Sequence, residues 1–101
     1  MPKLYEYFGL IILFYSLEHE PIHVHGKYQD KESKAVLLFE NGKFIGIEIK
    51  NVKGKKPLDE KNLKKLKLII EKYRDDIVHK WIDYFVYNIP VKSEVINKRI
   101  V

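Results

Sequence analysis

Three of the four histidines fall close together, in the segment HEPIHVHGKY that spans residues 19 to 28. His19 lies two residues before Pro21, and His23 and His25 follow with a single residue between them. Imidazole titrates near neutral pH, so two histidines can act as the acid and the base of a proton transfer. Neutral imidazole also binds zinc and similar ions. This segment is therefore the first candidate for a functional site.

One interpretation is acid/base catalysis without a metal cofactor. Residues two apart in a strand project from the same side, so His23 and His25 would share a face with Lys27. Such a pair could supply the acid and base of a phosphodiester cleavage, while a lysine stabilises charge developing on the phosphate. Tyr28 could stack on an unpaired base or donate a hydrogen bond, although its place on the other strand face also suits a core residue. With His19 in the preceding turn, these are the candidate catalytic residues.

Two other interpretations of the segment stay open. His19, His23 and His25, with a nearby carboxylate from Glu18 or Glu20, fit a divalent metal such as zinc, nickel or iron. Histidines are also tolerated on half-exposed strands for structural reasons alone. Covalent catalysis by cysteine is excluded because the chain has no cysteine. Neither a G-x-G-x-x-G pattern nor a P-loop is present, so no nucleotide cofactor is implied.

The elements that must position this segment follow from hydrophobic periodicity. Period two dominates the first half of the sequence and period three to four the second, which predicts an α+β fold. Strands are expected over residues 8–15, 22–28 and 34–39, with a fourth around residues 45–49. Asn41-Gly42 predicts a type I′ turn before that fourth strand. A four-stranded, mostly antiparallel sheet is the simplest arrangement.

A long C-terminal helix is expected over about residues 59–87. Asp59 suits the N-cap position, and Asn88 and Pro90 end the helix. One apolar stripe runs through the segment in steps of three or four, made by Leu63, Leu66, Ile70, Tyr73, Ile77, Trp81 and Phe85. A break near residues 74–76 stays open. We therefore expect one α+β domain over residues 1–88, with residues 89–101 as an extension that forms an edge strand or a docking tail.

Composition narrows the classes of function. A length of 101 residues, 46% hydrophobic and 33% charged, fits a single globular domain. The net charge is +5, with 19 basic and 14 acidic residues. The basic residues are lysines except for Arg74 and Arg99. Lysines attract phosphates but do not read base edges in the bidentate way of arginine. The apolar stretch 7–17 is too short to span a membrane and lacks the features of a secretory signal, so a cytoplasmic location is expected. The sequence leaves a homodimer open.

The histidine segment and its surroundings resemble a known family. The residues that carry the resemblance are Met1-Pro2, Phe8-Gly9 in an apolar strand, His19, Pro21, His23, His25, Tyr28, and Trp81 near the end of the helix. This pattern is similar to the bacterial family known as domain of unknown function 4160, over about residues 1–85. The sequence differs from the common pattern at Glu20, where asparagine is usual, and at Ile22, where a second proline is usual.

The resemblance implies a role as the toxin of a toxin–antitoxin pair, of the kind called DhiT-like, with a small antitoxin-like partner encoded beside it. Two classes of function result. In the first, the protein is a toxin that acts on RNA or another phosphate-bearing target through the histidine strand, with ribonuclease-like chemistry as one form. In the second, it is a non-enzymatic protein-binding module, and the histidines are incidental or bind a metal.

Overall fold

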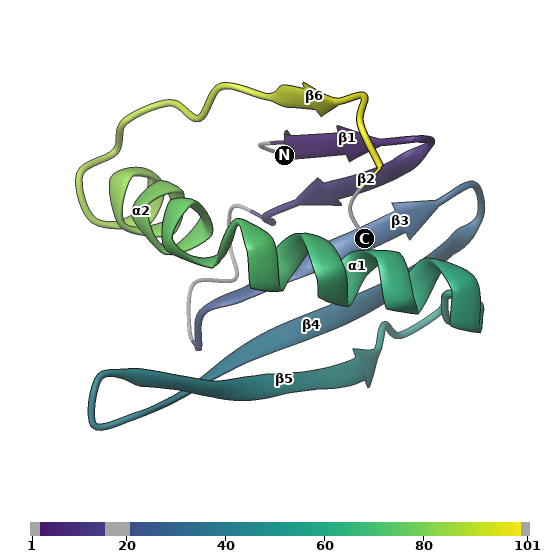
Figure 1. Cartoon of the computed structure of the whole chain (residues 1–101), viewed down its shortest axis with the longest axis horizontal. Helices are drawn as coiled ribbons and strands as arrows, with labels where there is room; N and C mark the ends of the chain where they lie inside the picture. Colours follow the sequence, from purple (N-terminus) through teal and green to yellow (C-terminus); the bar gives the residue numbers. More distant parts are fainter. Residues whose placement is uncertain (1–2, 16–20, 100–101) are drawn as a thin grey trace.

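A computed structural model of the chain describes residues 3–15 and 21–99. Its strands are β1 (Lys3–Tyr7), β2 (Leu10–Leu13), β3 (His23–Tyr28), β4 (Lys31–Glu40), β5 (Lys43–Asn51) and β6 (Glu94–Ile96), and its helices are α1 (Glu60–Lys72) and α2 (Arg74–Phe85). The strands form one sheet in the order β5-β4-β3-β2-β1-β6. Figure 1 shows α1 lying across one face of this sheet.

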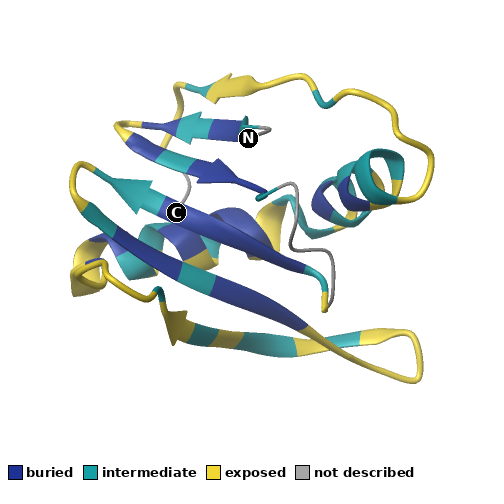
Figure 2. Ribbon diagram, turned by 180° about the vertical axis from the view of Figure 1, so that it is seen from behind, coloured by how far each residue is buried: buried dark blue, intermediate teal, exposed yellow. Residues whose placement is uncertain are grey.

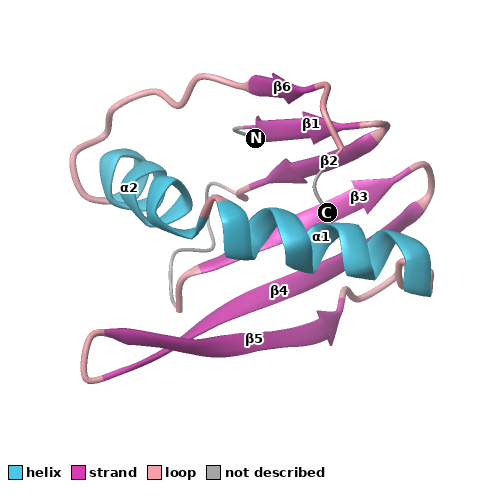
Figure 3. Cartoon of the chain, viewed as in Figure 1, coloured by secondary structure: helices cyan, strands magenta, loops and turns pink. Residues whose placement is uncertain are grey.

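The sheet is mixed. Strands β1 to β5 pair with their neighbours in antiparallel fashion, whereas β6 pairs with β1 in parallel. The long connection from α2 to β6 carries the chain to the outer edge of β1 (Figure 3). The α+β class is therefore confirmed, but the prediction of four strands is corrected to six. Strand β1 was not predicted, and β6 is an edge strand within residues 89–101, which was one of the two alternatives left open there.

Strand β1 was missed because its hairpin turn has an unusual residue. Phe8 and Gly9 join β1 to β2 with positive φ angles of 47° and 88°, the backbone of a type I′ turn. A bulky aromatic residue rarely adopts this conformation, so the apolar run 8–15 reads as one continuous strand. The predicted turn at Asn41 and Gly42 is confirmed, with φ angles of 52° and 79°.

The predicted long helix is two helices. Tyr73 separates them, with φ of −107° and ψ of 20°, one residue before the region where a break was left open. Asp59 is the N-cap of α1, and its carboxylate accepts a hydrogen bond from the Asn62 backbone N–H at 2.9 Å. This hydrogen bond is the main cause that lowers the pKa of Asp59. Among the described residues, neither helix is long and apolar enough to cross a membrane.

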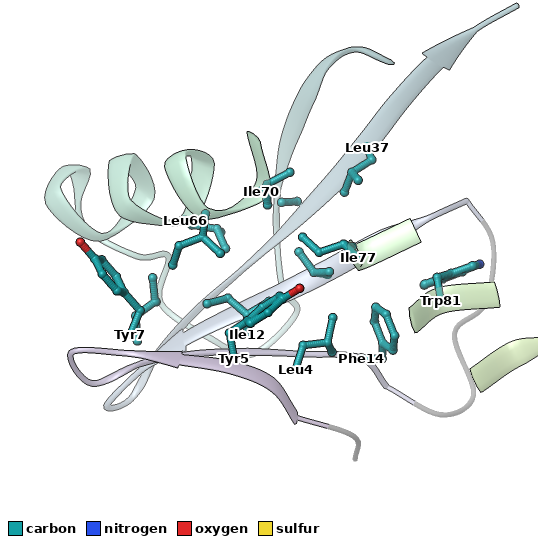
Figure 4. Close-up of a cluster of buried hydrophobic side chains, with 14 of the residues drawn as sticks. Leu4, Tyr5, Tyr7, Ile12, Phe14, Leu37, Leu66, Ile70, Ile77 and Trp81 are labelled. Atoms are coloured by element: carbon teal, nitrogen blue, oxygen red, sulfur yellow. The ribbon is translucent and has the colours of Figure 1, made fainter. Parts of the chain in front are cut away.

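One face of the sheet packs on the helices and forms the core. Side chains from β1, β2 and β4 meet those of both helices in Figure 4, including Tyr5, Ile12, Leu66 and Ile77. Gly26 of β3 allows α1 to approach closely, since a β-carbon there would lie only 2.9 Å from Leu66 Cδ2. Helix α1 therefore buries one side of β3, and the alternate residues of the strand lie on the other side.

We call the side of the sheet away from α1 the histidine face; at one end of it Trp81 of α2 contacts His23. It carries Ile11, Leu13, His23, His25, Lys27, Glu32, Lys34 and Val36, as the strand register requires. Figure 2 is seen from this side, and β3 and β4 are buried along much of their length. The histidine face is thus well covered at its centre, and the candidate residues lie there.

Candidate functional site

His23 and His25 lie on the same face of β3, as expected from strand alternation. His25 is opposite Leu13 of β2 and Lys34 of β4, and His23 is opposite Val36. The centroids of the two imidazole rings are 5.5 Å apart. Both residues are only 2% exposed. The strand therefore brings two buried imidazoles side by side.

A tyrosine and a glutamate hold the His25 ring. His25 Nδ1 lies 2.9 Å from Glu32 Oε2, and the Tyr15 hydroxyl donates a hydrogen bond to the same oxygen at 2.9 Å. The Tyr15 ring also meets the His25 ring edge to face, with centroids 4.3 Å apart. We call Tyr15, Glu32 and His25 the Tyr-Glu-His cluster. An ionised carboxylate only accepts hydrogen bonds, so Nδ1 of His25 donates when Glu32 is charged.

His23 is held by the backbone. Its Nδ1 lies 2.7 Å from the carbonyl oxygen of Pro21, and its ring packs against the indole of Trp81 at 5.2 Å between centroids. A carbonyl oxygen can only accept, so Nδ1 of His23 carries the proton. In both histidines the anchored atom is thus Nδ1, and Nε2 is the atom with a lone pair when the ring is neutral.

Glu32 is an unusual residue for the middle of a sheet. It is 1% exposed, and its Oε2 atom accepts both hydrogen bonds of the Tyr-Glu-His cluster. No residue in the ranges 3–15 and 21–99 donates a hydrogen bond to its other oxygen, Oε1. A buried carboxylate with an unsatisfied oxygen costs free energy, and such groups are typical of functional sites.

The other predicted site residues are distributed differently. Lys27 is directly opposite Glu32 and shares the histidine face. Tyr28 lies on the helix face, packed against the hydrophobic core, and its ring would be 3.0 Å from a β-carbon on Gly9. The structure therefore does not bring Tyr28 together with the histidines. His19 lies outside the described residues.

Glu32 and Tyr15 were not predicted as site residues from the sequence. The strands predicted from the sequence end at residue 28 and resume at residue 34, whereas the connection is a tight turn at Gln29 and Asp30, and β4 begins at Lys31. Gln29 has a positive φ of 56°, which its residue type does not indicate. With that turn recognised, the register alone would have put Glu32 opposite Lys27 and next to His25 on the same face.

The anchoring of both rings also suits metal binding. Histidines that bind metals usually donate the other ring N–H to a carboxylate or a backbone carbonyl, as His25 and His23 do. Across the described part of the chain, no group of three or more His, Asp or Glu side chains is arranged to hold a metal ion. The predicted three-histidine metal site includes His19 and so extends beyond those residues.

Comparison with known proteins identifies the family. The model of a family described as Domain of unknown function (DUF4160) matches residues 9–82, and the chain belongs to this family. The matched part contains β2 to β5, α1 and most of α2, with His23, His25 and the whole Tyr-Glu-His cluster. Strands β1 and β6 lie outside it. No curated protein and no solved structure matches the chain.

Proposed function

We propose that the protein is the toxin of a toxin–antitoxin pair and acts on RNA, or on another phosphate-bearing target, through His25 and His23. The observation that carries the proposal is the contact of 2.9 Å between His25 Nδ1 and the buried carboxylate of Glu32. A carboxylate in this position fixes the ring and its tautomer, and it stabilises the imidazolium that forms when Nε2 takes a proton.

On RNA, the reaction would transfer the phosphoryl group from the 5′-oxygen of one nucleotide to the 2′-oxygen of the preceding ribose. The ribose 2′-oxygen forms a bond to phosphorus while the bond from phosphorus to the 5′-oxygen breaks. His25, supported by Glu32, takes the proton of the 2′-hydroxyl, and His23 in its protonated form gives a proton to the departing 5′-oxygen. The separation of 5.5 Å between the rings allows both to reach one phosphate.

Lys27 and the charge of the whole chain support a phosphate-bearing target. Lys27 shares the histidine face and lies opposite Glu32, so its ammonium group can approach a phosphate bound there. The net charge of +5 favours association with a polyanion in a salt-dependent manner. The same charge suits a small acidic antitoxin as the partner.

The burial of both histidines favours a second candidate function. Rings that are 2% exposed can also serve the packing of the sheet, in a protein-binding module with no catalytic activity. For the toxin, the same burial means that the target reaches Nε2 only when the histidine face opens locally. The two candidates differ in what they predict for substitutions of His25 and Glu32.

Induced expression in bacterial cells tests the proposal. We expect the unaltered chain to arrest growth, co-expression of the adjacent small gene to relieve the arrest, and the His23→Ala/His25→Ala double variant to be inactive. His79→Ala is the matched control, because His79 lies exposed on α2. Thermal melting confirms that each variant is folded, and His25→Gln, which keeps a hydrogen-bond donor, replaces the double variant if that one unfolds. Undiminished growth arrest by a folded variant without His25 would remove the histidines from the mechanism.

A further inference from the structure

The tip of the β4–β5 hairpin and the first turn of α2 form a cavity outside the Tyr-Glu-His cluster. The cavity measures about 350 Å³ and is lined by Phe39, Gly42, Lys43, Phe44, Arg74 and Asp75. The tip extends past the ends of the other strands in Figure 1, and Figure 2 shows that it is largely exposed. A cavity of this size is at the small end of the range for ligand sites, which suits a single small group better than a folded partner.

Flat side chains form one wall of the cavity. Phe39 is 40% exposed, and its ring meets that of Phe44 at 5.7 Å between centroids. The guanidinium group of Arg74 lies over the Phe44 ring at 4.8 Å. Unpaired bases of RNA stack on aromatic rings and on guanidinium planes, and an exposed Phe39 offers such a surface. The exposure of a large aromatic ring is otherwise unfavourable in water.

The charged groups of the cavity match a nucleotide. Lys43 and Arg74 supply two positive charges beside the aromatic wall, as a phosphate requires. Asp75 is fully exposed, and its carboxylate lies 3.8 Å from Arg74 Nε. A carboxylate accepts hydrogen bonds, so Asp75 suits a ribose hydroxyl group and would favour RNA over DNA. Nothing lies within 4 Å of a β-carbon placed on Gly42, so this side of the cavity is open.

The cavity lies at the same end of the sheet as the histidines. Val36 is opposite His23 and precedes Phe39 by three residues of strand, which corresponds to about 10 Å. Phe39 pairs with Phe44, and the Phe44 ring packs against the core on the helix face, so the cavity and the histidines lie on opposite sides of the sheet. A flexible strand of RNA held at the tip could therefore pass around the end of the sheet towards His23.

We propose that this cavity binds one unpaired nucleotide of single-stranded RNA, with its base stacked on Phe39 and its phosphate near Lys43 and Arg74. The inference rests on the proposed function only in taking RNA as the target. It assigns a binding role to residues that the acid/base chemistry does not use, and it makes binding separable from catalysis.

Fluorescence anisotropy with a labelled, unstructured oligouridine tests the proposal. The protein carries His25→Ala, so that cleavage cannot obscure binding. We expect Phe39→Ala to weaken binding about tenfold, the effect of losing one stacked base. Tyr87→Ala is the control, because Tyr87 is an exposed aromatic residue two positions beyond the C-terminal end of α2, away from Arg74 and Asp75 at its start. Lys43→Gln should reduce the slope of log affinity against log salt concentration by the contribution of about one phosphate contact. Lys98→Gln should change this slope less.

The possible outcomes separate the two proposals. Equal RNA affinity for Phe39→Ala and the parent protein, or no RNA binding at all, would overturn the nucleotide site, while growth arrest that depends on His25 would still support the toxin proposal. RNA binding that depends on Phe39, together with absence of growth arrest, would support the nucleotide site alone. If Phe39→Ala instead weakens only the complex with the antitoxin, the tip is a protein-docking surface. Equal affinity for DNA of the same sequence would overturn the assignment to RNA.

Discussion

At the scale of single residues, Glu32 distinguishes the histidine face from an ordinary strand pair. Its Oε2 atom holds His25 and Tyr15, while Oε1 has no donor among the described residues. Hydrogen bonds to a charged group contribute more than neutral ones, but the burial of the charge offsets that gain. Residues retained at such a cost are found where the chemistry of a site needs them.

We predict that Glu32→Gln removes growth arrest but changes the free energy of unfolding by less than about 1 kcal/mol. The amide oxygen can still accept from Tyr15 or His25, and the uncompensated charge is gone. Tyr15→Phe leaves the buried side chain of Glu32 with one hydrogen-bond donor fewer, so it should destabilise the fold by about 1–3 kcal/mol. Urea unfolding and the growth assay measure the two effects. A loss of more than about 3 kcal/mol in Glu32→Gln would mark the residue as structural.

At the same scale, the sequence predicted part of the site. The two-residue spacing of His23 and His25 was sufficient to place them on one face, because alternation is a property of any strand. Glu32 could not be found in this way, since its position depends on a turn whose first residue, Gln29, has a positive φ of 56°. Contacts between side chains on neighbouring strands depend on the register of the two strands. They can be predicted from the sequence only when the turn that sets this register is recognised.

At the scale of elements, the distance between α1 and the sheet depends on Gly26. A β-carbon at this position would lie 2.9 Å from Leu66 Cδ2 and 3.3 Å from Leu58 Cδ1. Both leucines are buried, so they have little room to move. The helix can therefore approach β3 only where the strand has no side chain.

We predict that Gly26→Ala destabilises the fold by about 1–3 kcal/mol, the usual effect of overpacking a core. Gly46→Ala is the matched control, because Gly46 also lies in a strand and a β-carbon there meets nothing within 4 Å. Alanine should be neutral or stabilising at that position, since it reduces the entropy of the unfolded chain. Chemical unfolding of the two variants measures the difference. Equal effects would mean that α1 adjusts freely to an added methyl group.

Sequence periodicity predicted the elements where local signals were ordinary. The Asn41-Gly42 turn and the Asp59 cap have the residue types that their geometry favours, and both were recognised. The Phe8-Gly9 turn does not, because a bulky aromatic residue rarely adopts a positive φ. The break at Tyr73 lies one residue before the region 74–76, where a break was left open. Residues 89–101 were left open between an edge strand and a docking tail, because the three residues of β6 are too few for a clear periodic pattern.

At the scale of the whole molecule, a polar network joins β1, α2 and β6. The Tyr5 hydroxyl donates a hydrogen bond to Asp76, and Lys80 Nζ lies 3.0 Å from Asp76 and 3.2 Å from Glu94. Burial, and then the hydrogen bond to Asp76, raises the pKa of Tyr5 well above its usual range. Burial alone would raise the pKa of Asp76, but the hydrogen bonds from Tyr5 and Lys80 outweigh it and lower this pKa.

We predict that Asp76 contributes to stability above its ordinary pKa of about 4 and that this contribution is lost as the pH falls through the lower value in the folded protein. The sign follows because the unfolded chain binds the proton more tightly than the folded one. Asp76→Asn should therefore reduce the decline of melting temperature as the pH falls below about 4. Asp75→Asn is the control, because Asp75 is the neighbouring residue in the sequence and its own carboxylate is fully exposed. An unchanged pH dependence in Asp76→Asn would mean that the network contributes little to stability.

The pairing of β6 with β1 also constrains how the molecule is made. Tyr5 is opposite Glu94, so β1 obtains its outer neighbour only after the ribosome has synthesised the chain as far as β6. Until then the border of β1 stays open, although the hairpins from β1 to β5 can already form. The six-stranded sheet, and the contact between Lys80 of α2 and Glu94 of β6, can therefore form only after the hairpins, once β6 has been synthesised.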